Sequence, residues 1–338
     1  MKKFLKVLLI IILVLVAIVA LVLLGGMAYF KISNADYFNN SERQIKIPDI
    51  HNGFIPQGLS YDENSNTLLL GGYTNNGKNS PIYVISLDNN EVKKVNLNKQ
   101  DGSAFKGHAG GLQVHNNYVY VAGSTSGLVY VYSYEDILNV QNNGYVNCLG
   151  EVSFKTDNDK MRVSFVTEIE GNFAIGEYYA PGYSTNESHH YGNSFGIEQG
   201  ALLVLFKYDE NSEFGLSNEP IKAYSIPNNI QGATSKDGTL FLTASSGPTR
   251  SKMYTFDLTG IENAKNTTVN TILDKEIDIT ILDNNYVSKI TEFQPMGEEV
   301  VIIDDKVFVA CESASNAYYF GNLYGAQYLY ATKLSYFK

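Results

Sequence analysis

Short stretches that alternate apolar and polar residues recur along most of the chain, separated by turns rich in Asn, Gly, Asp and Ser. One pattern occurs five times: an apolar residue entering a strand, a polar turn, and a second apolar run. Its anchors are Leu59, Leu112, Val166, Ala233 and Val300, which are 53, 54, 67 and 67 residues apart. Repeats of about 50 residues built from short strands are typical of β-propellers. The pattern therefore predicts an all-β, five-bladed β-propeller.

Each blade needs about four antiparallel strands. We expect third strands at 81–87, 128–134, 201–208, 252–258 and 327–334, and fourth strands at 92–97, 147–154, 221–226 and 269–281. The fifth blade lacks a fourth strand, and residues 43–47 have the pattern to supply it and close the ring. A six-bladed propeller is the alternative if the connection 261–293 contains a further sheet. Helical periodicity is nearly absent after residue 31, and 134–140 is the best short candidate.

The first 31 residues differ from this pattern. Lys2, Lys3 and Lys6 precede Val7 to Phe30, an uncharged and almost wholly apolar run of 24 residues. As a helix this run is about 36 Å long, enough to cross a bilayer core of about 30 Å. We therefore expect residues 1–31 to form a single transmembrane signal anchor, 32–42 a linker and 43–338 the propeller; a cleaved signal peptide is the alternative. The lysines before the run place the C-terminal domain outside the cytoplasm, at the cell membrane.

Charge limits the classes of partner. All 35 acidic residues but only 21 of the 25 basic residues follow position 31, which leaves a net charge of −14 there. Nucleic acids are bound by clustered Lys and Arg, so no nucleic-acid partner is expected. Only Cys148 and Cys311 occur, in different repeats, and no disulfide is expected between them.

Alignment of the repeats brings polar residues to the central channel. Gln57, Gln231 and Glu298 share one column just before the anchors, and His108 lies near it in the second repeat. Neighbouring glycines in this column allow the innermost strands to approach closely. A ring of amides and a carboxylate is one way to bind a small molecule or a hard cation such as Ca²⁺. The alternative is a structural hydrogen-bonded ring.

Other candidates lie where second strands end. Glu177 and Glu312 stand where other repeats have small or apolar residues, which marks them for ligand or metal contact or for structural hydrogen bonding. Two insertions, 179–199 and 313–325, follow them on the same side of the disc, either as a binding rim or as variable surface loops. The first insertion contains the adjacent pair His189 and His190, candidate ligand-binding residues. His108 is a candidate general acid or base.

Several phrases resemble those of bacterial secreted or membrane-anchored β-propeller proteins of uncharacterised function. The phrases are QGL at 57, HAGGL at 108, TEIEGNFAIGEYYAPG at 167, QGA at 231 and PMGEEVVIIDDKVFVACESAS at 295. Residues 54–59 are more distantly similar to a blade opening of plant-type glutaminyl cyclases, whose tryptophan-bearing phrases this chain lacks. Lactonase-type and strictosidine-synthase-like propellers hold a channel Ca²⁺ with Glu and Asn, and Glu177 and Glu312 are the matching residue types here.

The chain has no G-x-S-x-G elbow, P-loop, H-E-x-x-H motif or cysteine cluster. We therefore predict a membrane-anchored, extracytoplasmic binding module whose partner is a small molecule or a component of the cell envelope. The alternative is a channel-centred hydrolase or cyclase, with or without Ca²⁺, that uses Glu177, Glu312 and His108.

Overall fold

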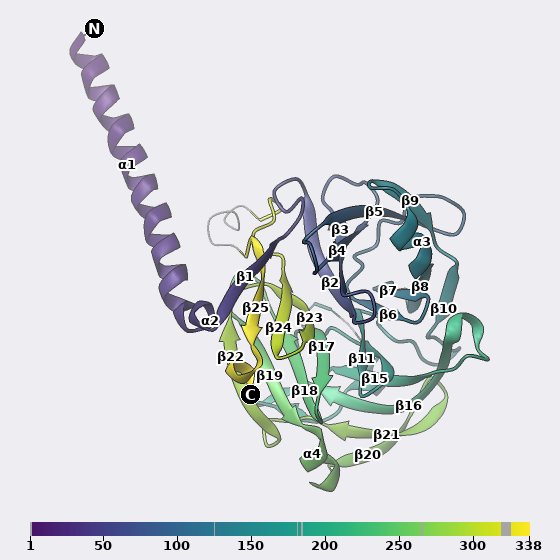
Figure 1. Cartoon of the computed structure of the whole chain (residues 1–338). Coiled ribbons are helices and arrows are strands. Elements are labelled where there is room, and N and C mark those ends of the chain that lie inside the picture. Colours follow the sequence, from purple (N-terminus) through teal and green to yellow (C-terminus); the bar gives the residue numbers. More distant parts are fainter. Residues whose placement is uncertain (1, 125, 181, 184, 265, 319–325) are drawn as a thin grey trace.

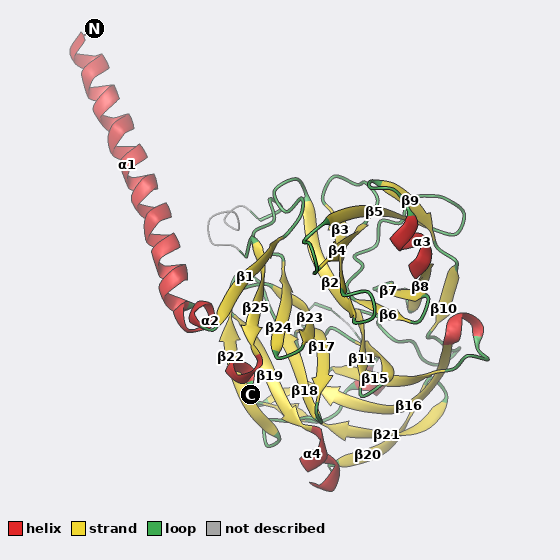
Figure 2. Cartoon of the chain, viewed as in Figure 1, coloured by secondary structure: helices red, strands yellow, loops and turns green. Residues whose placement is uncertain are grey.

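Five sheets, each built on four antiparallel strands, surround a central axis (Figure 1). The computed structural model describes residues 2–124, 126–180, 182–183, 185–264, 266–318 and 326–338. Apart from one long N-terminal helix, the described regular structure is mainly strand (Figure 2). The predicted five-bladed β-propeller is confirmed.

The first two blades follow the predicted order. The first contains β2 (Phe54–Asp62), β3 (Thr67–Thr74), β4 (Pro81–Ser86) and β5 (Val92–Asn98). The second contains β6 (Leu112–His115), β7 (Tyr118–Ala122), β8 (Leu128–Ser133) and β10 (Gly150–Ser153). The predicted helix at 134–140 is present as α3 (Tyr134–Asn139), which begins where the Ser133 hydroxyl accepts a hydrogen bond from the Asp136 N–H.

The remaining blades complete the ring. The third contains β11 (Phe165–Ile169), β12 (Asn172–Gly176), β15 (Ala201–Tyr208) and β16 (Leu216–Ile226). The fourth contains β17 (Ile230–Lys236), β18 (Thr239–Ala244), β19 (Ser251–Asp257) and β22 (Val287–Phe293). The fifth contains β23 (Gly297–Ile303), β24 (Lys306–Cys311), β25 (Tyr328–Lys333) and the N-terminal strand β1 (Ser41–Lys46). Short elements lie between them: η1 (Glu187–His189), β13 (Asn193–Ser194), β14 (Ile197–Glu198), η2 (Glu213–Gly215), α4 (Leu258–Ala264) and α6 (Leu334–Phe337).

Two outer strands differ from the prediction. Residues 269–281 are not the fourth strand of the fourth blade, which is β22. They belong instead to the hairpin of β20 (Thr267–Ile272) and β21 (Lys275–Ile281), whose second strand pairs in parallel with β16 of the third blade. The hairpin widens a neighbouring sheet, so the long connection does not form a sixth blade. In the same way β9 (Gly144–Asn147) adds a parallel fifth strand to the first blade, and only the end of the predicted strand 147–154 belongs to the second.

The ring closes as predicted, because the N-terminal strand completes the last blade. β1 pairs antiparallel with β25, from Ser41 opposite Thr332 to Lys46 opposite Tyr328. The outer edge of the fifth sheet is thereby covered by a strand from the other end of the chain.

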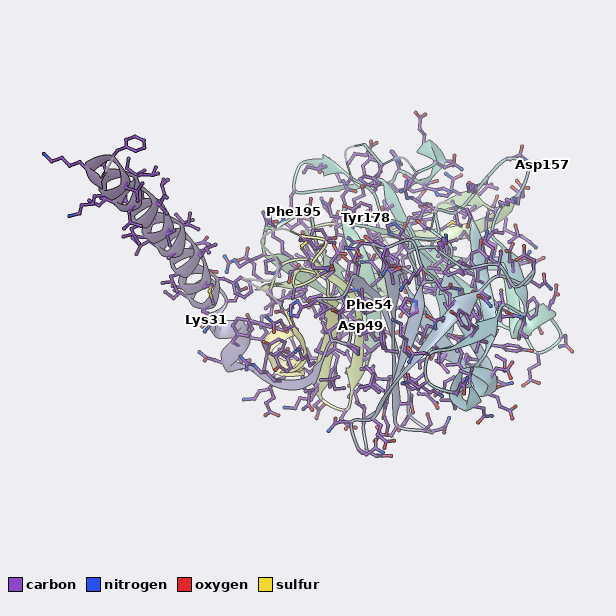
Figure 3. All side chains as sticks on the ribbon, turned by 90° about the horizontal axis from the view of Figure 1, so that it is seen from above. Lys31, Asp49, Phe54, Asp157, Tyr178 and Phe195 are labelled. Atoms are coloured by element: carbon purple, nitrogen blue, oxygen red, sulfur yellow. The ribbon has the colours of Figure 1, made fainter. Side chains whose placement is uncertain are left out.

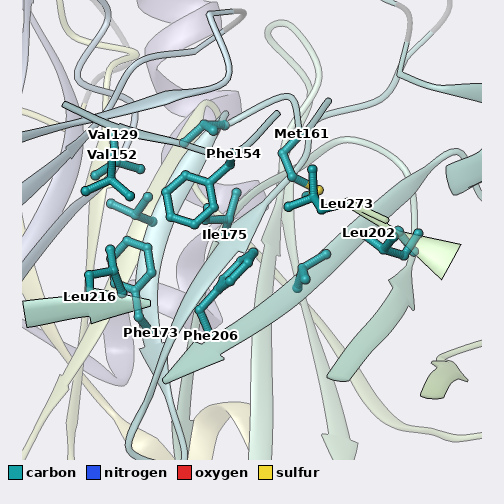
Figure 4. Packing of buried hydrophobic residues seen from close by; sticks show 14 of the residues in the cluster. Val129, Val152, Phe154, Met161, Phe173, Ile175, Leu202, Phe206, Leu216 and Leu273 are labelled. Carbon is teal, nitrogen blue, oxygen red and sulfur yellow. The ribbon is translucent and has the colours of Figure 1, made fainter. Parts of the chain in front are cut away.

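Apolar residues are buried between blades rather than within one layer. Each of five hydrophobic clusters joins two successive blades, including the last and the first. Figure 4 shows the cluster between the second and third blades, where Phe154 meets Phe173 and Phe206. Because both faces of a blade are covered, its second strand is a continuous apolar run, as at Leu68 to Leu70 in β3. Cys148 and Cys311 are both buried and free.

The N-terminal helix α1 (Lys2–Ser33) projects from the rim of the disc, and its apolar side chains from Phe4 to Leu24 are exposed (Figure 3). It is long and apolar enough to cross a membrane, a test that an N-terminal signal sequence also passes. The expected linker at 32–42 is mostly regular structure: the end of α1, the short helix α2 (Ala35–Asn39) and the start of β1.

Gly111 shows why glycines precede the innermost strands. A Cβ atom placed on it would lie 2.3 Å from the Val166 backbone nitrogen and 2.9 Å from Oε2 of Glu299. We expect Gly111→Ala to lower the free energy of unfolding by about 2 kcal/mol, because the added methyl group overpacks two adjacent blades. Urea denaturation of the full chain in detergent measures this change. Gly25→Ala is the control, since a Cβ there meets no atom within 4 Å and the backbone is that of the helix α1; an equal loss for both variants would contradict the packing argument.

Candidate functional site

Three innermost strands carry a β-bulge at the same position. The strand register shifts between Pro56 and Leu59 in β2, between Ile230 and Gly232 in β17, and between Gly297 and Val300 in β23. The residues left out of the strand pairing are Gln57 and Gly58 in β2, Gln231 in β17, and Glu298 and Glu299 in β23. Bulges take residues out of the strand pairing and re-aim their side chains, and they are common next to functional sites. Gln57, Gln231 and Glu298, which the repeats align at one position, therefore all lie in β-bulges near one end of the axis.

Three of these residues and two that follow β24 lie together in a group that we call the mouth cluster: Gln57, Gln231, Glu298, Glu312 and Tyr318. The Gln57 side chain donates from Nε2 to Oε2 of Glu312 at 2.8 Å. Tyr318, in the loop after β24, donates its hydroxyl to Oε1 of Glu312 at 2.7 Å. Gln231 donates from Nε2 to Oε1 of Glu298 at 3.3 Å. Side chains of the first, fourth and fifth blades therefore converge on two carboxyl groups.

These carboxyl groups hold protons more tightly than ordinary glutamates. Burial raises the pKa of Glu312 to about 7, against the lowering effect of its hydrogen bonds from Tyr318 and Gln57. Burial raises the pKa of Glu298 well above its usual value, and the nearby Glu312 and Glu299 raise it further. At neutral pH the pair therefore retains at least part of its protons. A cation placed between the two groups would favour their ionised forms.

Glu299 lies deeper on the axis and is fully buried. Its Oε1 accepts hydrogen bonds from the backbone N–H groups of Ala233 at 3.1 Å and Val300 at 3.3 Å. Its Oε2 has no hydrogen-bond partner among the described residues and lies against Gly111 of the second blade. Burial raises the pKa of this carboxyl well above its usual value. The side chain thus reaches from the fifth blade to Gly111 of the second blade and Ala233 of the fourth.

Aromatic residues surround the mouth cluster. Burial raises the pKa of Tyr73 to about 12, and the neighbouring Glu312 contributes to that rise. Tyr178, at the end of the second strand of the third blade, is close enough to Glu298 to have its pKa raised by burial, a nearby tyrosine and this carboxyl. His108 stacks on Tyr73 with ring centroids 4.3 Å apart, and burial lowers its pKa. The second and third blades therefore add His108 and Tyr178, so that all five blades contribute to this end of the axis.

Glu177 belongs to a different group, the histidine clamp, formed by Asp159, Glu177 and His189. His189 Nδ1 lies 3.0 Å from Oε2 of Glu177, and its Nε2 lies 3.0 Å from Oδ1 of Asp159. The side chains of Glu177 and His189 are 0% exposed. Burial lowers the pKa of His189, but the two carboxylates outweigh this effect and raise it to about 10. The clamp is a buried ion-paired triad in which the histidine is positively charged.

The clamp fastens three loops together. Glu177 also accepts hydrogen bonds from the N–H groups of Arg162 at 2.9 Å and Leu202 at 3.2 Å. Asp159 accepts one from the N–H of Leu273, in the turn between β20 and β21, at 2.8 Å. The insertion at 179–199 is therefore tied to the connection between blades two and three and to the added hairpin. These surroundings indicate a structural role for Glu177 and His189 rather than ligand contact.

The clamp predicts a pH dependence of stability. The pKa of His189 is raised from 6.5 to about 10 on folding, so its contribution is full below about pH 6.5, declines as pH rises and is lost above about pH 10. We expect the free energy of unfolding to fall between pH 7 and 10.5 more steeply in the parent than in His189→Gln. Denaturation at several pH values measures the difference, in which the titration of other groups cancels. Parallel curves would contradict a charged His189.

The structure thus brings together Gln57, Gln231, Glu298, Glu312 and His108 and places Glu177 and His189 elsewhere. His190 contacts Thr185, with Nε2 3.0 Å from the hydroxyl, and packs against Tyr179. No pattern in the sequence indicated that His189 has carboxylate partners, because Asp159 lies in a connection outside the repeats. Tyr318 lies in the predicted insertion 313–325, of which residues 319–325 lie outside the described residues. In the part of the chain that the structure describes, no group of three or more His, Cys, Asp or Glu is arranged to hold a metal ion.

Comparisons with known proteins find similarity only to solved structures, at low sequence identity. No protein-family model matches the chain, and no curated protein matches it in sequence. Similar solved structures include Myxococcus xanthus glutaminyl cyclase, with 10% identity, a TM-score of 0.40 and coverage of 84% of this chain and 90% of that one. The PQQ-bound aldose sugar dehydrogenase of Streptomyces coelicolor has 10% identity, a TM-score of 0.41 and coverage of 81% and 92%.

Kuenenia stuttgartiensis hydrazine synthase has 8% identity and a TM-score of 0.35; the match covers 75% of this chain but only 55% of that one. A glutaminyl cyclase is thus among the similar structures, as the resemblance of residues 54–59 predicts. Similarities at this level of identity and TM-score carry no argument about activity.

Proposed function

We propose that this protein is a membrane-anchored, extracytoplasmic propeller that binds a small organic cation at the mouth cluster. The observation that supports this most directly is the pairing of Glu298 and Glu312 at one end of the axis, where all five blades supply polar or aromatic side chains. Two buried carboxyl groups that lie close together keep protons because their ionised forms repel each other and are poorly solvated. A bound ammonium group would stabilise the ionised forms in place of those protons.

Aromatic side chains support a cation over a neutral ligand. Tyr73, Tyr178 and Tyr318 lie around the two carboxyl groups, and tyrosine ring faces attract ammonium groups. The carboxylate and amide oxygens present are also the kinds of ligand that Ca²⁺ takes. Because no group of three or more His, Cys, Asp or Glu among the described residues is arranged to hold a metal ion, we place an organic ammonium first and Ca²⁺ second.

The proposed membrane anchor is the helix α1. If the helix is retained, Lys2, Lys3 and Lys6 stay in the cytoplasm and the propeller lies outside it. The mass of the mature protein extracted from membranes tests this part alone: the full-length mass supports the anchor, and loss of α1 would identify a signal sequence.

Thermal unfolding tests the ligand. The full chain in neutral detergent is melted with n-butylammonium, with n-butanol as the uncharged control, with CaCl₂ and with EDTA. A ligand present at a hundred times its dissociation constant stabilises the folded state by about 2.7 kcal/mol. We expect n-butylammonium to raise the midpoint and n-butanol to leave it unchanged. A rise with CaCl₂ alone would replace the organic cation by Ca²⁺, and coincident curves under all four conditions would contradict a cation site.

A hydrolase or cyclase is the second candidate, and the pKa of Glu312 favours it. A carboxyl with a pKa of about 7 is suited to donate and accept protons near neutral pH, and His108 lies near it on Tyr73. Turnover of ester and lactone probes by the parent, lost in Glu312→Gln, would favour the enzyme. Turnover unchanged by this substitution, or none, would leave binding as the function of the cluster.

A further inference from the structure

The end of α1 is fixed against the propeller. The Arg250 guanidinium donates a hydrogen bond from Nη1 to the carbonyl of Ser33, the last residue of α1, at 3.0 Å. Phe30 packs against Phe38 of α2, with ring centroids 6.0 Å apart. Tyr37, also in α2, is buried against Phe293 and Tyr330. The helix therefore leaves the rim between the fourth and fifth blades at a defined place.

A pocket of about 630 Å³ opens at this junction, and we call it the junction pocket. Its walls come from the last turns of α1, from α2, from β1 and from the start of β25. Met27, Phe30 and Phe38 form its apolar part. Lys31 and Arg43 are its two cations, and the Arg43 guanidinium lies over the Tyr328 ring at 5.2 Å.

The charge of this pocket is opposite to that of the surrounding domain. None of the described residues that line it is acidic, although residues 32–338 carry a net charge of −14. The nearest acidic residues in the sequence face elsewhere: Asp36 lines the cavity on the other side of α2, and Glu42 lies 3.8 Å from Lys306. The pocket therefore suits an anion with an apolar part.

Its position identifies the source of that anion. When α1 spans a bilayer, Met27 and Phe30 lie at the edge of the hydrocarbon and Lys31 lies at the level of the headgroups. Arg43, Tyr328 and Tyr330 then face the same interface from the propeller side. Arginine binds phosphate groups well because its planar guanidinium presents several donors, and tyrosine is enriched at membrane interfaces.

We propose that the junction pocket binds an anionic phospholipid of the leaflet next to the propeller. Its phosphate contacts Lys31 and Arg43, and the upper part of an acyl chain lies on Met27 and Phe30. This inference rests on the proposed anchor but not on the ligand of the mouth cluster. A bound lipid would fix the propeller in orientation relative to the membrane surface.

The test uses the full chain in neutral detergent, titrated with dioctanoyl-phosphatidylglycerol and with dioctanoyl-phosphatidylcholine and followed by native mass spectrometry. We expect tighter binding of the anionic lipid, and a loss of about fivefold in its affinity for each of Lys31→Gln and Arg43→Gln. Lys46→Gln is the matched control, because Lys46 is exposed on the same strand as Arg43 and does not line the pocket.

Three results would overturn the proposal. One is equal affinity for the two lipids, and another is unchanged affinity in both Lys31→Gln and Arg43→Gln. The third is competition by inorganic phosphate at the lipid's own concentration, which would identify a soluble anion as the ligand. Removal of α1 in the mature protein would instead be seen in its mass, and failure of the mouth-cluster ligand would be seen in the n-butylammonium melts, so the three hypotheses fail separately.

Discussion

Replacement of His189 by alanine is expected to lower the free energy of unfolding by about 3–5 kcal/mol, because it leaves two buried carboxylates without their shared partner. Glu177 is 0% exposed and Asp159 nearly buried, so water does not replace the lost imidazolium. Chemical denaturation of the full chain measures the change. The effect should be largest below about pH 6.5 and should shrink as pH rises toward 10, where the His189 imidazolium loses its proton.

His190→Ala is the matched control for this experiment. His190 is the next residue in the same insertion and is only partly buried. Its ring contacts the Thr185 hydroxyl and one exposed carboxylate, that of Glu198 at 3.5 Å, rather than two buried ones. We expect a loss of about 1 kcal/mol from its hydrogen bond. Equal losses for the two variants would show that the insertion as a whole, rather than the clamp, determines stability.

Glu312→Gln is expected to weaken binding of n-butylammonium by about tenfold to a hundredfold, the value of a hydrogen bond to a charged group. The amide has nearly the shape of the carboxyl, so Gln57 keeps an acceptor in the variant, although Tyr318 must reorient. Calorimetric titration of the full chain measures the affinity.

Glu63→Gln removes a carboxylate of the same type from an exposed turn of the first blade and serves as the control. Its affinity should equal that of the parent. Equal weakening in both variants would mean that the net negative charge of the domain, rather than the mouth cluster, attracts the probe.

The propeller fold was predictable because the same strand–turn–strand sequence pattern occurs once in each blade. Five occurrences of one pattern place one anchor in each innermost strand, and the same alignment puts Gln57, Gln231 and Glu298 at equivalent positions in three of these strands. The closing strand β1 was predictable because the fifth blade lacked an outer strand and residues 43–47 had no other blade to join. Positions that recur in every repeat can therefore be found by aligning the repeats of the sequence.

Features outside the repeats were not predictable in this way. The alternating pattern of residues 267–281 suits an outer strand of either adjacent blade, and only the packing of Ile272, Ile277 and Ile279 into the cluster between blades two and three decides the outcome. The role of Glu177 depends on His189 and Asp159, which come from two loops whose meeting no periodicity encodes. A carboxylate in an apolar column correctly signalled a special environment, but it did not say whether the partner was a ligand or the protein itself.

The most direct test of the central claim is the affinity of the full chain for n-butylammonium between pH 5.5 and 8.5. Glu312 has a pKa of about 7 without ligand, and an ammonium group binds its ionised form, so a proton must leave for each cation bound in the acid range. The account predicts that affinity rises by at least about tenfold per pH unit up to about pH 7 and less steeply above it, and that Glu312→Gln lessens this dependence. An affinity that does not vary with pH, or that varies equally in the variant, would contradict a cation site at the mouth cluster.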